Sequence, residues 1–296
     1  MSIPARTPDY FHVDVFASNS LRGNGLCVFP QADHWSTQRM QELTREMRQF
    51  ESIFLQRVSE HGAEVRIFTM EEELGFAGHP LLGAAAVLHR MFKAPQDQEV
   101  EHRWTLQLQD RRHVQVYTKR KAKAFSCTMN QGEAEISDKI AQDALSQILN
   151  KLSLTVDDLD PIHAARVIST GLAYLVLPVR GEALARTKIV GTQLEAALQT
   201  LGAKFVFVVD VAHKEIRTWD NLGQVEDIAT GSAIGPAIAY LLESGLAKVG
   251  EQVTWQQGRF TGRPSQLLAW VDEQHQVWVS GEVWPYASGY FDCDLD

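Results

Sequence analysis

The sequence predicts an α/β protein of the α+β kind, built from two similar halves. Each half is expected to wrap a mostly antiparallel sheet or barrel around one central apolar helix. Two observations predict this fold. Strand-like and helix-like segments recur in the same order along both halves of the chain. Each half also holds one helix of small residues that is apolar almost all round, which indicates burial. These central helices are expected over residues 81–91 and 233–242.

The first half shows local signals for each of its elements. Residues 11–16 alternate as a half-buried strand does, and the glycines around Asn24 predict a turn into a second strand. Ser36 is placed to cap a helix whose apolar residues recur at helical spacing. In chain order we expect strands over 11–16 and 26–29, a helix from Ser36 to Phe50, strands over 53–55 and 65–69, and the helix over 81–91.

The second half repeats this order. We expect strands over 167–171 and 175–178, a helix over 192–201, strands over 205–210 and 216–220, and the helix over 233–242. An amphipathic helix over 138–152 and an acidic loop over 157–161 are expected between the halves, and the basic stretch over 111–121 is interpreted as a solvated edge hairpin.

Matching residues support a duplication. Arg66 and Arg217 are 151 residues apart, and Gly78 and Gly231 are 153 residues apart. Short matches of this kind also arise by chance, but here order, element type and spacing agree together. We expect the first half to span residues 1–120, joined by the C-terminal segment 284–296, and the second half to span 121–283.

Composition narrows the functional class. The 296 residues are 45% hydrophobic and 22% charged, which is typical of a soluble globular enzyme and excludes disordered, collagen-like and coiled-coil chains. The formal net charge is -9. Because an acidic surface repels phosphate backbones, we expect a small-molecule partner and no nucleic acid.

Cysteine use and the N-terminus indicate a cytoplasmic protein. The three cysteines, Cys27, Cys127 and Cys293, are far apart and form no C-x-x-C pair, which argues against a disulfide framework and a thiolate zinc site. The N-terminal segment contains Pro4 and Pro8 and no apolar run of signal-peptide length. The longest aliphatic stretches are strand-sized, so no membrane span is expected.

The two central helices begin with similar glycine turns, Gly78-His79-Pro80 and Gly231-Ser232-Ala233. A helix N-terminus presents unpaired N–H groups, and glycine lets a ligand approach the backbone closely. If the halves face each other, the two helix ends would meet at one cleft between domains. The alternative is that these residues only form turns and caps.

Two carboxylates lie near these turns. Glu51 is placed between Phe50 and Ile53, where a helix passes into a strand, and Asp227 precedes the second glycine turn. A carboxylate among apolar residues suits proton abstraction, because desolvation makes it a stronger base. Spacing alone favours a solvated helix-end charge for Glu51 and a loop or capping role for Asp227 over a role in catalysis.

Motifs for other chemistries are absent from the sequence. The ten histidines show no H-E-x-x-H or other ligand-like spacing. No G-x-x-x-x-G-K-[ST] loop, no G-x-G-x-x-G after a strand and no G-x-S-x-G elbow is present. We therefore expect neither a nucleotide, another cofactor nor a metal.

Several motifs that are present along the chain together resemble those of the phenazine-biosynthesis PhzF-like proteins, which share the diaminopimelate-epimerase-like duplicated fold. The likeness runs along most of the chain. It is carried by His12 to Phe16 with Arg22-Gly23-Asn24, Phe50-Glu51-Ser52, Arg66 to Thr69, Phe76 to Pro80, Ser169 to Leu172, Glu226-Asp227 with Ala229 to Ala233, and Gly258-Arg259 with Gly262 to Ser265.

The resemblance implies a cofactor-free isomerase that moves a proton between carbons of a cyclic amino-acid-like carboxylate. Glu51 matches the family's acid/base position. His79, Asp227 and Ser232, with Gly78 and Gly231, match positions that hold the substrate. The resemblance also implies a homodimer. A non-catalytic binding protein, or a lyase or hydrolase on the same scaffold, is the alternative.

Three differences from the family pattern concern the site. Related epimerases use two catalytic cysteines, and this chain has none near Gly78 or Gly231, which argues against epimerisation by a thiol pair. The family's Asp-Pro is Asp227-Ile228 here, and its Gly-Asn-Pro ends in Gly25. Losing a proline relaxes φ and adds an N–H, so the loop geometry is expected to differ while the side chains remain. Because the resemblance extends to proteins that act on other compounds than the phenazine precursor, it does not identify the substrate.

Overall fold

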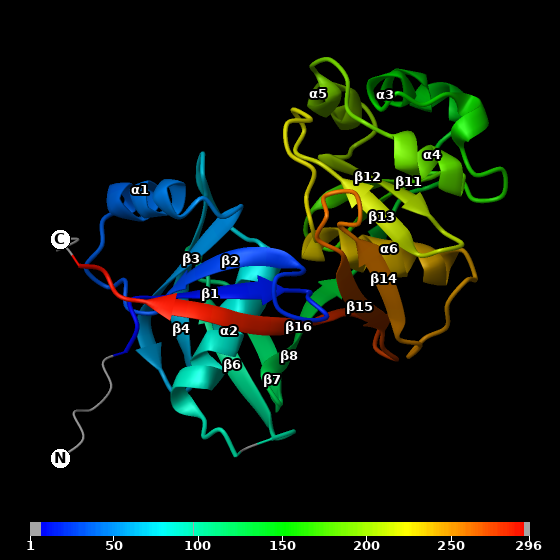
Figure 1. Cartoon of the computed structure of the whole chain (residues 1–296). Helices are drawn as coiled ribbons and strands as arrows, with labels where there is room; N and C mark the ends of the chain where they lie inside the picture. Colours follow the sequence, from blue (N-terminus) through cyan, green and yellow to red (C-terminus); the bar gives the residue numbers. More distant parts are fainter. Residues whose placement is uncertain (1–6, 97, 293–296) are drawn as a thin grey trace, which may run out of the picture. The chain divides into compact units, whose positions relative to one another are not determined.

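The structure is a computed structural model that describes residues 7–96 and 98–292. Two compact units divide the chain (Figure 1): Met1–Met129 with Ser280–Asp296, and Asn130–Val279. Residues 1–6 and 293–296, with Cys293, lie outside the described residues. Two strands, β8 (Ala124–Glu133) and β16 (Gln276–Gly289), contain the points of division.

The sheet of the first unit closes on itself. Its strands follow the order β1-β2-β3-β4-β6-β7-β8-β16, and β1 also pairs with β16. Most pairs are antiparallel, but β2 and β3 are parallel, as are β4 and β6. The bounds are β1 Tyr10–Val15, β2 Asn24–Phe29, β3 Glu51–Ser59, β4 Gly62–Thr69, β5 Glu73–Leu74, β6 Glu101–Gln107 and β7 His113–Lys121.

Helix α2 (Gly78–Phe92) lies at the centre of this unit, with the strands around it (Figure 1). Its residues are buried from Gly78 to His89, as its apolar sequence predicts. At Gly83 an added Cβ would lie 2.3 Å from the Cδ2 of Leu26 on β2. Glycine at this position therefore lets the helix approach the sheet closely.

Helix α1 (Thr37–Met47) covers the outside of the same sheet. The predicted cap is confirmed, because the hydroxyl of Ser36 accepts the N–H of Arg39 at 3.1 Å. The predicted end at Phe50 is wrong. Arg48 adopts a left-handed conformation, with φ of 52°, and this conformation ends the helix.

The second unit has the same plan around helix α6 (Gly231–Glu243), which is buried over most of its length. Its strands follow the order β16-β15-β14-β13-β12-β11-β10-β9. The bounds are β9 Glu135–Ile136, β10 Arg166–Ser169, β11 Ala173–Pro178, β12 Phe205–Asp210, β13 Glu215–Thr218, β14 Val253–Gln257 and β15 Ser265–Val271.

The pairing pattern is repeated between the units, as the duplication predicts. Each unit has an antiparallel hairpin, a parallel pair across a helical connection, a second antiparallel pair, and a parallel pair across the central helix. Side-chain contacts repeat as well. Arg66 pairs with Glu73 at 2.6 Å, and Arg217 pairs with Glu226 at 2.7 Å.

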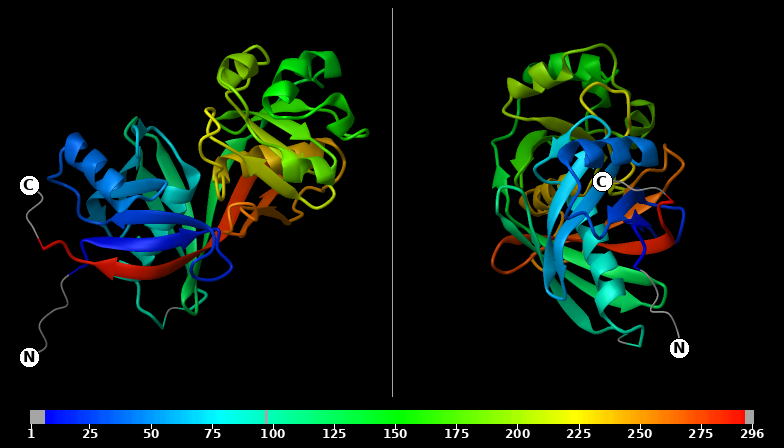
Figure 2. Two further views of the ribbon diagram at one scale, coloured as in Figure 1. Left: turned by 45° about the horizontal axis from the view of Figure 1, so that its top comes forward. Right: turned by 90° about the vertical axis from the view of Figure 1, so that its left-hand side faces the viewer.

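Short helices cover the outer face of the second sheet, on one side of this unit (Figures 1 and 2). They are the 3-10 turns Gln142–Leu145 and Val156–Asp158 and the helices α3 Ser146–Lys151, α4 Gly181–Arg186 and α5 Leu194–Gln199. Apolar residues of the first turn and of the three helices share one core with β11 and β12.

Two further local predictions are wrong. A single helix over 138–152 does not form, because the N–H groups of Ser137 and Ile140 donate to carbonyls next to β10 and hold this part of the chain extended. The basic stretch over 111–121 is not an edge hairpin. Strand β7 lies between β6 and β8 and pairs with both, so each of its edges is used.

Candidate active site

Glu51 is the first residue of β3 and is held by strands on both sides. It pairs with Leu26 of β2 and with Thr69 of β4. Its neighbour Ser52 lies on the same face as Phe54, which packs under α1, so the side chain of Glu51 points the other way, towards α2. Glu51 is 7% exposed. The solvated helix-end charge considered for this residue is therefore not what the structure shows.

His79 meets this carboxylate from the first turn of α2. Its Nδ1 lies 3.6 Å from Oε2 of Glu51. The imidazole is buried, and burial lowers the pKa of His79 to about 3. The nearby helix N-terminus also disfavours a cation. His79 is therefore neutral near pH 7, and its Nε2 is buried with no hydrogen-bond partner among the described residues.

The pKa of His79 predicts that stability falls in mild acid. Between the unfolded value of 6.5 and the folded value of about 3, the unfolded chain binds a proton that the folded chain does not. Stability is therefore fully present above pH 6.5 and is lost as the pH falls below it, by up to about 1.4 kcal/mol per pH unit. Urea unfolding at pH 7.5, 6.5 and 5.5 measures how steeply the free energy of unfolding changes with pH.

The matched comparison uses two histidine variants. His79→Gln should flatten this pH dependence, because the buried titrating group is gone. His61→Gln, at a side chain that is 86% exposed, should leave it unchanged. Equal slopes for the wild-type protein and His79→Gln would contradict the assignment.

In the second unit, Asp227 shapes the loop that leads into α6. Its carboxylate accepts the hydroxyl of Thr230 and, at 3.3 Å, the N–H of Ala229. The loop role considered for Asp227 is thus observed. The missing proline at position 228 does not open the loop, since these bonds and a bond from the Asp227 N–H to the Thr218 carbonyl hold it.

Gln257, on β14 (Val253–Gln257), fixes the same loop. None of the sequence motifs predicts a role for this residue. Its side chain is 1% exposed, accepts the N–H of Thr230 at 2.9 Å, and donates to the carbonyl of Asp227 at 2.9 Å. Gly258 follows with φ of 80°, and a Cβ there would lie 2.6 Å from the carbonyl oxygen of Ile228. A buried glutamine on a strand has no local signal that distinguishes it from a core residue.

The first turn of α6 is anchored by its backbone. The amide of Gln131 donates to the carbonyl of Gly231 at 2.9 Å, and the hydroxyl of Thr170 donates to the same amide at 3.1 Å. At Gly235 an added Cβ would lie 2.2 Å from Gln131 Oε1. The hydroxyl of Ser232 lies 2.8 Å from the hydroxyl of Tyr174.

Neither central helix begins with a side-chain cap. The residues at the N-cap positions, Ala77 of α2 and Thr230 of α6, make no side-chain cap hydrogen bond. The capping role considered for His79 and Ser232 is thus not the arrangement observed. In general, the first N–H groups of a helix have no partner within the helix, and such groups can bind an anion.

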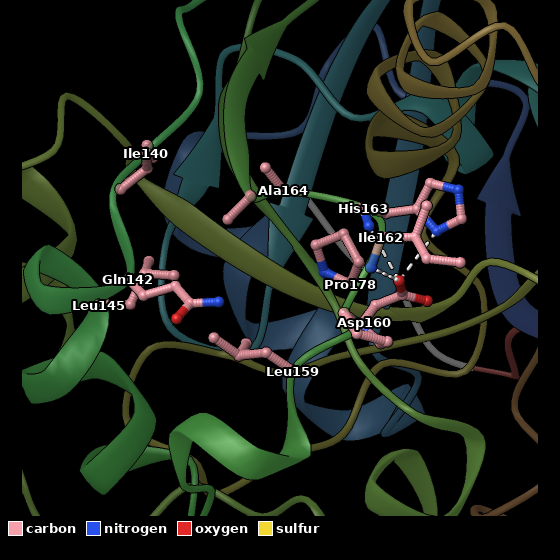
Figure 3. A pocket seen from close by; sticks show the side chains of 11 residues that line it. Ile140, Gln142, Leu145, Leu159, Asp160, Ile162, His163, Ala164 and Pro178 are labelled. Carbon is pink, nitrogen blue, oxygen red and sulfur yellow. Dashed lines mark hydrogen bonds and ion pairs between the residues drawn. The ribbon is translucent and has the colours of Figure 1, made fainter.

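A separate cavity of the second unit contains none of the predicted site residues. It measures about 100 Å³ and is bordered by Leu145, Leu159 and Ile162, with Asp160 and His163 paired at 3.0 Å (Figure 3). Ligand pockets are commonly several times larger.

Neither the cysteine thiols nor a metal-binding cluster provides a second reactive site in the described residues. Cys27 and Cys127 are buried, and burial raises the pKa of both thiols. Among residues 7–96 and 98–292, no group of three or more His, Cys, Asp or Glu side chains is arranged to hold a metal ion. In the same part of the chain, no helix is long and apolar enough to cross a membrane.

The model of the PhzC-PhzF family, described as phenazine biosynthesis-like protein, matches residues 13–289. The chain belongs to this family. The resemblance inferred from the motifs is thus confirmed, and the match includes Glu51, His79, Asp227 and Ser232.

Individual relatives of this PhzC-PhzF protein support the class of reaction and the fold. The trans-2,3-dihydro-3-hydroxyanthranilate isomerase of Pseudomonas aeruginosa is 31% identical over 95% of this chain and 98% of its own. A predicted epimerase of the same organism has a TM-score of 0.90 and 46% identity, covering 97% of this chain and all of that one. A probable proline racemase from Agrobacterium radiobacter shares the fold at 12% identity, with a TM-score of 0.59, covering 97% and 94%. The protein is an isomerase of the PhzC-PhzF family.

Proposed function

We propose that this isomerase moves a proton between two carbons of a small cyclic carboxylate, with Glu51 as both the base and the acid and with no cofactor. The observation that carries the proposal is the buried carboxylate of Glu51 beside a neutral imidazole. Oε2 of Glu51 lies 3.6 Å from Nδ1 of His79. General acid–base catalysis of this kind contributes about 10² to 10⁴-fold to a rate.

The charge balance at this pair suits a proton carrier. If His79 were a cation, it would stabilise the carboxylate and weaken it as a base. Since burial lowers the pKa of His79 to about 3, the imidazole is neutral and places no positive charge beside the Glu51 carboxylate. A carboxylate that takes a proton from one carbon can return it to another on the same face of the substrate. Both steps need only a fixed carboxylate and a fixed substrate.

Substrate binding is assigned to Gly78 and His79 of the first unit and to Asp227, Gly231 and Ser232 of the second. The support comes from the uncapped starts of α2 and α6 and from the bonds that order the loop before α6. A carboxylate is the chemistry that such N–H and hydroxyl donors recognise.

The experiment is proton exchange in heavy water. The wild-type protein is incubated with trans-2,3-dihydro-3-hydroxyanthranilate, the compound in the name of the relative, and with other cyclic unsaturated carboxylates. Mass spectrometry then counts incorporated deuterium. We expect incorporation into at least one compound with a carbon acid next to, or conjugated with, the carboxylate. Equal rates with and without a chelator are expected, and loss of exchange with the chelator would contradict a metal-free base.

The family likeness also supports a homodimer. Light scattering of the purified protein should give twice the chain mass of 33.2 kDa. A monomeric mass at micromolar concentration would remove this part of the proposal.

A further inference from the structure

We infer that Tyr174, which no motif marks, positions the hydroxyl of Ser232 so that this hydroxyl donates to the substrate carboxylate. The inference rests on the proposed function, because it refines how the second unit binds the substrate. It is carried by one contact and by a correspondence between the two units.

The contact is a direct hydrogen bond between two hydroxyl groups. The phenolic oxygen of Tyr174 lies 2.8 Å from Oγ of Ser232. A phenol is a stronger donor than an aliphatic alcohol, since a phenol ionises near pH 10 and an alcohol does not ionise in this range. The favoured arrangement therefore has Tyr174 donating and Ser232 accepting. The hydrogen of the Ser232 hydroxyl is then free to bind an anion.

The surroundings hold Tyr174 in place. Tyr174 is 4% exposed, and its ring contacts those of Phe205 and Phe207 at centroid distances of 5.5 and 5.8 Å. Ser232, in contrast, is partly exposed at the first turn of α6. The pair thus consists of one rigid buried hydroxyl and one hydroxyl that a ligand can reach.

The two units carry their side-chain pairs on neighbouring strands of the same ladder: Glu51 belongs to β3, and Tyr174 belongs to β11, the counterpart of β2. In the parallel ladder of the first unit, the first matched residues are Leu26 and Glu51. In the equivalent ladder of the second unit they are Tyr174 and Phe205. In both units, a residue at the start of this ladder contacts the second residue of the central helix.

The two units therefore carry different side-chain pairs at the starts of their central helices. The first unit has the carboxylate and imidazole of Glu51 and His79, 3.6 Å apart. In the second unit Phe205 takes the position of Glu51, and the hydroxyl of Tyr174, from the adjacent strand, contacts Ser232 instead. A carboxylate in the place of Tyr174 would repel an anionic substrate, whereas the phenol of Tyr174 leaves the Ser232 hydroxyl able to donate to it. Under this proposal Glu51 of the first pair transfers the proton, and Ser232 of the second pair contributes a donor for the substrate carboxylate.

The test measures binding and not turnover. The probe is 3-hydroxyanthranilate, the aromatic counterpart of the compound in the relative's name, and the comparison compound is its uncharged carboxamide. Affinities are measured by calorimetry for wild type, Tyr174→Phe, Ser232→Ala and the double variant. Ser232→Ala should weaken carboxylate binding roughly tenfold or more, because a charge-assisted hydrogen bond is lost. Tyr174→Phe should weaken it roughly fivefold, and the double variant should bind no more weakly than Ser232→Ala alone.

The carboxamide separates positioning from a general packing defect. Tyr174→Phe should change carboxamide binding by less than roughly twofold, since no anion is held. Tyr240→Phe is the control for a lost tyrosine hydroxyl. Tyr240 lies on α6, the helix of Ser232, and its hydroxyl donates to the carbonyl of Ala164 at 2.8 Å. It should leave both affinities unchanged.

Three results would overturn the inference. They are additive losses in the double variant, equal losses for the carboxylate and the carboxamide, and no saturable binding of the carboxylate by the wild-type protein. Failure of the proposed function would give a different experimental result. A protein that binds the probe as expected but exchanges no deuterium refutes the role of Glu51 and leaves that of Tyr174 intact.

Discussion

Glu51→Gln should lower deuterium exchange by about 10² to 10⁴-fold, the contribution of general acid–base catalysis. Glutamine keeps the volume of the side chain but accepts no proton at neutral pH. Substrate binding should persist, because the N–H and hydroxyl groups assigned to it are untouched. The measurement is the initial rate of deuterium incorporation by mass spectrometry, together with substrate affinity from calorimetry.

The control for this variant is a glutamate of the same unit without a proposed role. Glu42, on α1, pairs with Arg39 and is 46% exposed, so Glu42→Gln should exchange deuterium at the wild-type rate. Exchange by Glu51→Gln at that same rate would show that another group moves the proton. A large loss of affinity with no change in the maximal rate would instead make Glu51 a binding residue.

Arg217→Met should destabilise the protein by about 3 to 5 kcal/mol, the usual cost of removing one partner of a buried ion pair. Arg217 is 8% exposed at its side chain and makes two hydrogen bonds to Glu226, of 2.8 and 2.7 Å. It also donates to carbonyls at the end of α4, those of Leu184, Ala185 and Thr187. Methionine would leave Glu226 without this partner and these carbonyls without a donor.

Urea unfolding measures this loss, and an exposed pair provides the control. Arg112 pairs with Asp110, with side chains 62% and 49% exposed. Arg112→Met should therefore change the free energy of unfolding by less than about 1 kcal/mol. Similar losses for the two variants would contradict the expectation that the buried Arg217–Glu226 pair stabilises the fold more than an exposed pair does.

Much of the fold is predictable from local sequence. The opening hairpin, the Ser36 cap and the two central helices rest on signals within a few residues, such as alternation, glycine turns and apolar composition. The duplication is also visible in sequence, since Arg66 and Arg217 keep their spacing. Local signals fail where partners are distant. The extended chain near Ile140 forms because its N–H groups reach carbonyls beside β10, and periodicity does not register such partners.

The candidate site, like the fold, is only partly predictable from the sequence. The sequence by itself determined which residue types stand at each glycine turn and, through the motifs, pointed to Glu51, His79, Asp227 and Ser232. Only the tertiary structure decided what these side chains touch. The contact between Glu51 and His79, the clamp of Gln257 on the loop before α6, and the hydroxyl pair of Tyr174 and Ser232 join residues 27 to 58 positions apart. The physical reason is that strand register and the depth of each central helix set these distances, and both arise from packing across the whole sheet.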